Sequence, residues 1–452
     1  MRQAARFGSR QVGFAGICLG YFAIILDGSV LNIAVPALRR DLHTSLASVQ
    51  WVINAYTLCL AALLLTAGAL GDRWGLRRCF LWGTAIFTVA SLACSLAPSV
   101  PVLILARVVQ GVGAAALLPA TLALIRTLFT DAGERGRATA IWVSTGAIAT
   151  AVGPMVGGLL IDAFGWRAIF LINLPIGVVA ILLGRAGITE APRHARGVDH
   201  AGQLTAVAAL GLITAGVIVS GGAGWTAPLS LGLLAAGVVS AAAFWLVERR
   251  VAEPMLPPAF FSVRVRSVAV ASAAFMGFLF YGTLFVMSLY FQQVRGWSAG
   301  EAGVALLPLT VGSTIGSLVL YRPLARRFGD AVALVSGFAC CASGVVVLLV
   351  FTRAAGYTPI AVGLLLVGVS STIAFSALTS LLVPSVPVNQ SGIASGVQNT
   401  SRQTGALMSV AVLGAILNTA VFTARLPVAL GVLAGVVVLA LVAAGFATRP
   451  AR

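Results

Sequence analysis

Long apolar stretches, each separated from the next by a short polar segment, are the feature of this sequence that most restricts its fold. Fourteen of them are long enough to cross the hydrocarbon core of a bilayer, which takes about 20 helical residues. Backbone groups find no water there, so these stretches must be α-helices. The expected spans are residues 13–37, 48–70, 79–97, 99–129, 138–161, 166–184, 203–220, 227–247, 267–292, 302–320, 331–351, 358–383, 392–422 and 427–447. Since 9% of the residues are charged, against about 25% in soluble domains, the sequence predicts an all-α polytopic membrane protein.

The 29 basic residues are distributed unevenly around these spans. Of these, 21 lie in the tails and loops on the side of the N-terminus, six lie on the other side, and two, Arg107 and Arg402, lie within spans. Cytoplasmic loops of membrane proteins carry such an excess of arginine and lysine. We therefore predict a multi-pass protein of the cytoplasmic membrane with both termini in the cytoplasm. The net charge of +17 then requires no nucleic acid as a partner.

Two pairs of short segments suggest an internal repeat. ALGDRWG (69–75) aligns with PLARRFG (323–329), and GRAT (136–139) aligns with GIAS (392–395), at offsets of 254 and 256 residues. The similar offsets predict two halves of six helices each, residues 1–186 and 263–452, with two helices inserted at 187–262. Transporters built from repeats bind their substrate at the interface between them, near the membrane midplane.

Asp27 lies near the middle of the first expected span, where a charge costs at least about 2.5 kcal/mol and marks a functional residue by default. On a helix it shares a face with the small residues Gly20, Ala23 and Ala34, which allow a neighbouring helix to approach closely. It is the one acidic residue expected deep in a span, so it is the candidate proton carrier. The alternative is a structural carboxylate that a neighbouring helix satisfies.

Arg107 in the fourth span lies at a similar expected depth, about 12 Å from the surface against about 15 Å for Asp27. Burial raises the pKa of a carboxylate and a nearby guanidinium lowers it, so the pair can change protonation when access changes. We predict that both residues couple transport to protons. Gln110 on the face of Arg107 is expected to line a substrate cavity. The alternative for Arg107 is an anchor that reaches the membrane surface.

The thirteenth span contains the polar run NTSRQTG (399–405). Gln398, Asn399 and Arg402 are expected to line a polar part of the substrate cavity. Arg402 is deep if the helix enters the membrane at Gly392, and it lies at the surface if the helix enters at Gln403. Both interpretations stay open.

The fifth span places Gly146, Gly153 and Gly157 at helical spacing, with Pro154 removing the backbone bond to Thr150. This pattern predicts a bend and a close-packing face at the seam between the halves, or ordinary tight packing. Neither reading excludes the other.

The histidines and cysteines provide no sign of enzyme chemistry. None of the three histidines lies in an expected span, so no buried triad or metal site is expected. None of the six cysteines lies in an external loop opposite another, so no disulfide is expected. The protein is therefore predicted not to be an enzyme, and to need no metal and no cofactor.

Four motifs, in order and on the matching spans, resemble those of the major facilitator superfamily, and within it the 14-span drug:proton antiporters. They are LDGSVLNIAVPAL (26–38), GALGDRWGLRR (68–78), RVVQGVG (107–113) and GPMVGG (153–158). The resemblance covers nearly the whole chain. It implies a major facilitator fold of two six-helix halves plus two inserted helices, fourteen transmembrane helices in all.

The resemblance also implies roles for two of these motifs. The loop motif is a conformational switch that latches the halves on the cytoplasmic side, and the fifth-span motif distinguishes exporters from importers. The switch residues are Gly68, Asp72, Arg73, Gly75, Arg77 and Arg78, and the antiporter residues are Gly146, Gly153, Pro154, Gly157 and Gly158. Arg326 stands in the second half where Asp72 stands in the first, so any latch there is degenerate.

These observations predict an exporter driven by the proton gradient and working by alternating access. Many apolar residues and few charges in the spans predict a permissive site for lipophilic drugs, dyes or antibiotics. We expect the protein to work as a monomer. Two alternatives stay open: a metabolite importer or symporter on the same scaffold, and a non-transporting, lipid-handling membrane protein.

Overall fold

Helices make up almost all of the part of the chain that the computed structural model describes, which is residues 2–190, 199–251, 253–352, 356–387, 391–418 and 422–447. No β-strand occurs in these ranges. Residues 191–198, in the charged segment between the first six expected spans and the next two, lie outside the described residues. The predicted all-α fold is confirmed.

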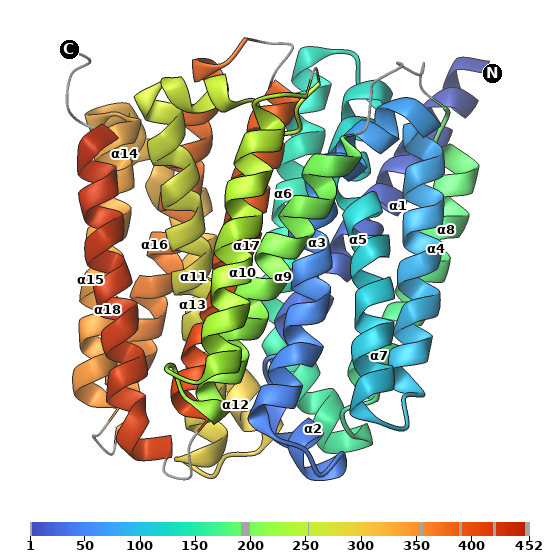
Figure 1. Ribbon diagram of the computed structural model, residues 1–452. Coiled ribbons are helices and arrows are strands. Elements are labelled where there is room, and N and C mark those ends of the chain that lie inside the picture. The colour runs from blue at the N-terminus through green and yellow to red at the C-terminus, as the bar shows by residue number, and fades with distance from the viewer. Residues whose placement is uncertain are drawn as a thin grey trace.

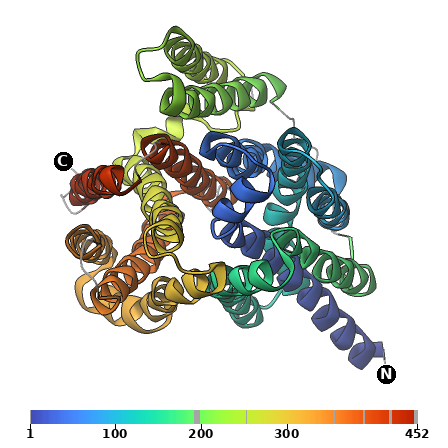
Figure 2. The ribbon, with the colours of Figure 1, turned by 90° about the horizontal axis from the view of Figure 1, so that it is seen from below.

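The helices fall into three groups, which Figure 2 shows in a view along their axes. The N-terminal bundle contains α1 (Arg2–Val30), α2 (Val35–Asp41), α3 (Leu46–Trp74), α4 (Leu76–Ser95), α5 (Val100–Leu128), α6 (Ala132–Phe164), α7 (Ala168–Leu171) and α8 (Asn173–Gly187). The inserted pair is α9 (His200–Ala223) and α10 (Pro228–Glu248). The C-terminal bundle contains α11 (Arg264–Gln293), α12 (Ala299–Ala305), α13 (Leu307–Ile315), α14 (Tyr321–Phe328), α15 (Asp330–Phe351), α16 (Thr358–Leu382), α17 (Ser391–Leu417) and α18 (Phe422–Ala447). The domain boundaries at residues 186 and 262 stay predictions.

Thirteen helical segments in the described residues are long and apolar enough to cross a membrane. The remaining expected span, residues 392–422, corresponds to α17, which has 27 residues and contains the polar run NTSRQTG. It stands within the protein rather than at its edge, because it packs against α11, α3 and α9. Figure 1 shows that it runs alongside these helices through the height of the molecule. A polar helix in this position has protein and not lipid around it.

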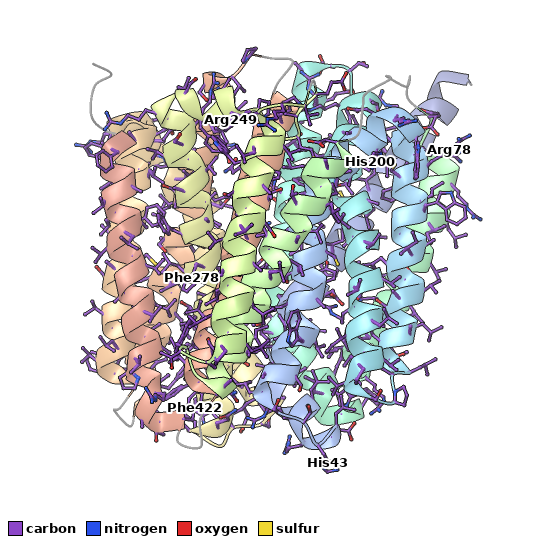
Figure 3. All side chains as sticks on the ribbon, in the orientation of Figure 1. His43, Arg78, His200, Arg249, Phe278 and Phe422 are labelled. Carbon is purple, nitrogen blue, oxygen red and sulfur yellow. The ribbon has the colours of Figure 1, made fainter. Side chains whose placement is uncertain are left out.

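The molecule has two end faces. Helix α1 begins and α18 ends at the same one, which we call the termini face (Figure 1). Arg78, His200 and Arg249 also lie at the termini face, and His43 lies at the opposite face (Figure 3). We use these two names below.

The prediction of one continuous helix over residues 13–37 is wrong. Helix α1 ends at Val30, and a turn precedes α2. Pro36 is the physical reason, because proline has no N–H to bond the carbonyl of Asn32 and its ring clashes with that carbonyl. The carbonyl of Asn32 instead accepts a hydrogen bond from Ser288 of α11, at 2.9 Å. Asp27 therefore lies in the last turn of α1 and not in the middle of a span.

The loop motif is mostly helical. Helix α3 continues to Trp74 and α4 begins at Leu76, so only Gly75 separates the two helices. Gly75 has φ +104°, a conformation that residues with a Cβ rarely adopt. Gly329, its partner in the predicted repeat, separates α14 from α15 in the same way with φ +83°. The two copies of the repeat thus share a backbone break.

Candidate functional site

A cavity of about 480 Å³ lies between the N-terminal bundle and α17. Its mouth is at the termini face, where Asp72, Arg126 and Asp199 line it close to the ends of their helices. Its deep wall includes Tyr21 of α1 and Arg402 of α17. Arg402 lies eleven residues from the start of α17, or about 16 Å along the helix. This position favours the deep one of the two depths considered for Arg402, which stays a prediction.

At the opposite face the two bundles are in direct contact. The Asp162 carboxylate at the end of α6 accepts hydrogen bonds from the Ser298 hydroxyl at 2.8 Å and from two backbone N–H groups of α12, at Ala299 (3.2 Å) and Gly300 (2.8 Å). These N–H groups lack partners within their own helix, and a carboxylate is a favourable acceptor for them.

Two further contacts join the bundles near this face. The Gln292 amide of α11 donates to the carbonyl of Ile33 at 3.1 Å, beside the bond from Ser288 to Asn32. The Gln50 amide of α3 donates to the carbonyl of Val410 in α17 at 3.0 Å. The structure therefore has a cavity that opens at the termini face and a closed opposite face.

A buried ion pair occupies the interior of the N-terminal bundle. An Arg107 Nη1–H donates to Asp27 Oδ2 at 2.5 Å, and the two side chains are 1% and 2% exposed. The Gln110 and Asn173 amides each donate to Asp27 Oδ1 at 3.0 Å. Three donors from helices α5 and α8 thus satisfy a carboxylate that α1 carries.

The guanidinium of Arg107 has partners besides Asp27. Its Nε–H donates to the carbonyl of Val52 in α3 at 3.1 Å, and Nη1–H also donates to the Gln110 side chain at 2.6 Å. The guanidinium carbon lies 4.2 Å from the ring centroid of Tyr56, a favourable cation–π position. Neither Asp27 nor Arg107 lines the cavity. In this state the ion pair is closed off from the space that opens at the termini face.

The four residues predicted to line the cavity separate into two groups. Asn399 and Arg402 line it. Gln110 lies in the ion-pair cluster, where its amide also donates to the Ser91 hydroxyl at 2.6 Å. Gln398 is buried and donates to the Thr379 hydroxyl at 2.9 Å. Gln110 and Gln398 do not line the cavity, and the roles of all four stay predictions.

Four of the predicted antiporter residues make close helix contacts. A Cβ at Gly146 would clash with the Tyr21 side chain of α1. In the same way, a Cβ at Gly153 would clash with Ser29, and a Cβ at Gly157 would clash with Val30.

Gly158 instead faces the Ala299 carbonyl of α12, across the two bundles, where a Cβ would also clash. Next to it, Gly303 lies against the carbonyl of Pro154. One surface of α6 thus packs inside the N-terminal bundle, and the adjacent surface forms the closed opposite face.

The switch motif lies at the mouth of the cavity. Gly68 and Asp72 line it, and Arg73 and Arg78 are exposed. The Arg77 side chain donates to the carbonyl of Arg185 at 3.2 Å, within the N-terminal bundle. Among the described residues, no side chain of the motif hydrogen-bonds to the C-terminal bundle, which agrees with the cavity being open here. The role of the motif as a latch stays a prediction.

Four residues of these sites were missed by sequence reasoning. Asn173 and Ser91 complete the ion-pair cluster. Tyr21 and Trp142 form a stacked pair in the cavity wall, with ring centroids 4.0 Å apart and planes at 18°. Asn173 is an amide within an apolar span, which was an available signal. Nothing in the sequence indicates which helices Tyr21 and Trp142 face.

The chain belongs to the Major Facilitator Superfamily, whose sequence profile matches residues 17–410. It is therefore a membrane transporter of this class and not an enzyme.

Characterised relatives carry names of resistance and export proteins. The chain is 36% identical over 411 residues to the tetracenomycin C resistance and export protein of Streptomyces glaucescens, covering 90% of this chain and 75% of the relative. It is 34% identical over 400 residues to the multidrug resistance protein Stp of Mycobacterium tuberculosis, covering 88% and 74%. It is 33% identical over 412 residues to the methylenomycin A resistance protein of Streptomyces coelicolor, covering 90% and 86%.

Solved structures share the fold at low sequence identity. The nucleoside transporter NupG matches with a TM-score of 0.69 at 11% identity, covering 97% of this chain and 100% of NupG. An auto-inhibited peptide transporter of the POT family matches with a TM-score of 0.68 at 18% identity, covering 98% and 99%. These two similarities show the architecture alone.

Proposed function

We propose that the protein is a proton-coupled exporter of lipophilic small molecules, of the 14-span drug:proton antiporter type. The observation that carries the proposal is the separation of two sites in one state: the cavity opens at the termini face, while the Asp27–Arg107 pair is buried away from it. The names of the relatives, which include resistance and export, support the direction of transport. On this proposal the termini face is cytoplasmic and the membrane is the cell membrane.

In the state described here, substrate enters the cavity from the cytoplasm while Asp27 is ionised and paired with Arg107. Rocking of the bundles then opens the opposite face and breaks the contacts of Asn32 and Ile33 with α11. These residues follow Asp27 by five and six positions, so the end of α1 that carries the carboxylate is released at the same step.

Release of this segment gives Asp27 access to the external solution, where it takes a proton. A protonated Asp27 no longer attracts the Arg107 guanidinium, so the pair re-forms only when the proton leaves on the cytoplasmic side. Substrate and proton thus favour different states, and the coupling between them is reciprocal.

The test is transport into everted membrane vesicles with an imposed pH gradient, using a panel of cationic, neutral and anionic lipophilic probes. Asp27→Asn keeps the size of the side chain and removes its charge. We expect the variant to bind a probe but to lose gradient-driven accumulation, so that the internal and external concentrations become equal.

Asp41→Asn is the matched control, because Asp41 is an exposed acid at the opposite face. It should pump like the wild type. Uphill accumulation by Asp27→Asn would overturn the proposal, and so would uptake in the importing direction.

A further inference from the structure

The deep wall of the cavity contains a cation, Arg402, that forms no ion pair with any carboxylate of the described residues. From it we infer that the transported molecule carries an anionic, hydrogen-bond-accepting group, so that lipophilic organic acids are the preferred substrate class. The inference rests on the proposed export function, because it assigns the substrate class of the same cavity. It follows from Arg402, Trp142 and the distribution of charge along the cavity.

Within the described ranges, the partners of Arg402 are all neutral. Its Nη1–H donates to the Tyr281 hydroxyl at 3.2 Å and its Nη2–H donates to the Asn399 side-chain oxygen at 3.4 Å. Its guanidinium also lies 5.9 Å from the Phe375 ring centroid. The ion pairs found in the described residues are Arg10–Glu134, Arg107–Asp27 and Arg167–Asp41, so no carboxylate there neutralises Arg402.

Two buried N–H donors in the cavity wall have no hydrogen-bond partner in the described part of the chain. They are Nε of Arg402 and Nε1 of Trp142. They belong to α17 and α6, which are helices of different bundles, and both residues line the same cavity. Unsatisfied buried donors are unfavourable, and a turn of these side chains toward the cavity would bring them to an acceptor placed between the bundles. A carboxylate has acceptors but no donors, so it is the complementary group.

The acidic residues that line the cavity and the arginine in its deep wall lie at different depths. The acidic lining residues Asp72, Asp199 and Glu253 lie at the mouth with Arg126, near the helix ends of the termini face. Arg402 lies about 13 Å further along its helix than Asp72 does along α3. This is well beyond the roughly 4 Å between the charged groups of a salt bridge, so the acids at the mouth form no ion pair with the deep cation.

The remaining deep wall suits the body of a lipophilic acid. Tyr21 and Trp142 stack on each other there, and Leu64, Leu118 and Pro119 add apolar surface. Gly146 is the residue that lets the Tyr21 ring lie this close to α6. A flat apolar molecule with one carboxylate would place its body on this wall and its charge on Arg402, with a charge-assisted hydrogen bond.

The test is binding of three probes that share one apolar body: 4-(1-pyrenyl)butyrate, its methyl ester, and 4-(1-pyrenyl)butylamine. Affinity is measured on the purified full-length protein in detergent by quenching of tryptophan fluorescence. We expect the wild type to bind the acid at least tenfold more tightly than the ester, and the ester more tightly than the amine.

Arg402→Gln should remove the preference for the acid and leave the affinity for the ester within about twofold, which also reports that the variant is folded. Arg402→Lys should retain part of the preference, and Trp142→Phe should weaken binding of the acid by a few-fold. Arg322→Gln removes an exposed arginine outside the cavity and is the charge-matched control.

Equal affinity of the wild type for the acid and the ester would overturn the inference, as would an unchanged preference in Arg402→Gln. Binding needs no proton gradient, so the two proposals can fail separately. A preference for the acid without uphill transport would contradict the proposed function alone, and uphill transport without that preference would contradict this inference alone.

Discussion

Two arginines lie deep in this membrane protein, and they differ in their partners and in their access to the cavity. Arg107 meets a carboxylate, an amide oxygen and a backbone carbonyl, and it is 1% exposed. Arg402 meets a phenol and an amide oxygen, and it faces a cavity. A deep cation that is paired with a buried carboxylate belongs to the internal machinery of the protein. A deep cation that has an unused N–H donor, and no carboxylate partner among the described residues, is available to bind an anionic ligand.

The largest expected effect comes from removing one member of the buried pair. Arg107→Gln leaves Asp27 buried without its cation, and breaking a buried pair costs about 3–5 kcal/mol. Arg402→Gln breaks bonds to neutral partners alone and should cost about 1 kcal/mol or less. The measurement is the free energy of unfolding in detergent, followed by circular dichroism.

The double variant Asp27→Asn/Arg107→Gln provides the control for this difference. It removes both charges and should recover most of the lost stability without recovering coupled transport. Equal destabilisation by Arg107→Gln and Arg402→Gln would contradict the distinction between the two arginines.

An intermediate effect is expected at the closed face, which keeps the ion pair away from external solvent. Gly158→Ala places a Cβ against the Ala299 carbonyl and should shift the population at least tenfold toward a state open at the opposite face. Gly435→Ala in α18 is the matched control, because a Cβ there meets no atom within 4 Å. The measurement is the distance between spin labels at residues 43 and 428 in a cysteine-free background, which should lengthen in Gly158→Ala alone. An unchanged distance would show that this contact does not close the face.

The smallest effect is expected for the exposed pair Arg167–Asp41, which contrasts with the buried one. Hydrogen bonds from Trp166 at 2.6 Å and from Arg167 at 2.7 Å lower the pKa of the Asp41 carboxyl. A lowered pKa in the folded state stabilises the protein above the unfolded-state pKa of about 3.9, and this stabilisation is lost as the pH falls through the folded-state value. Because the Arg167 and Asp41 side chains are about half exposed, their pairing contributes at most about 1 kcal/mol to the free energy of unfolding.

Comparing the unfolding midpoints of wild type and Asp41→Asn between pH 7 and pH 3 checks this prediction. The difference between them should be small at pH 7 and should shrink as the pH falls below about 4. A difference that grows on acidification would have the wrong sign.

The fold was largely predictable because a helix that crosses a bilayer must be apolar over most of its length, so the apolar stretches of the sequence mark the helices. The clearest error was the first span, where Pro36 was present in the sequence and ends the continuity that the apolar composition suggested. The turn it creates matters, since it exposes the carbonyls of Asn32 and Ile33 to α11.

The sequence predicted several of the residues that form the sites, but it did not predict how these residues are arranged relative to one another. Helical periodicity placed Asp27, Arg107 and Gln110 on inward faces, but it cannot distinguish a face inside one bundle from a face between two bundles. Gln110 accordingly lies with the ion pair and not in the cavity. The tyrosine–tryptophan stack depends on how α1 and α6 pack, and local sequence does not report this.

The central claim is that Asp27 carries the proton that is exchanged for substrate. The direct measurement is proton flux in proteoliposomes that enclose a pH-sensitive dye, after addition of 4-(1-pyrenyl)butyrate to one side. The account predicts that the wild type accelerates proton movement above the rate at which the acid alone carries protons into protein-free liposomes, and that Asp27→Asn gives no such excess. Equal acceleration in the two proteins would contradict it.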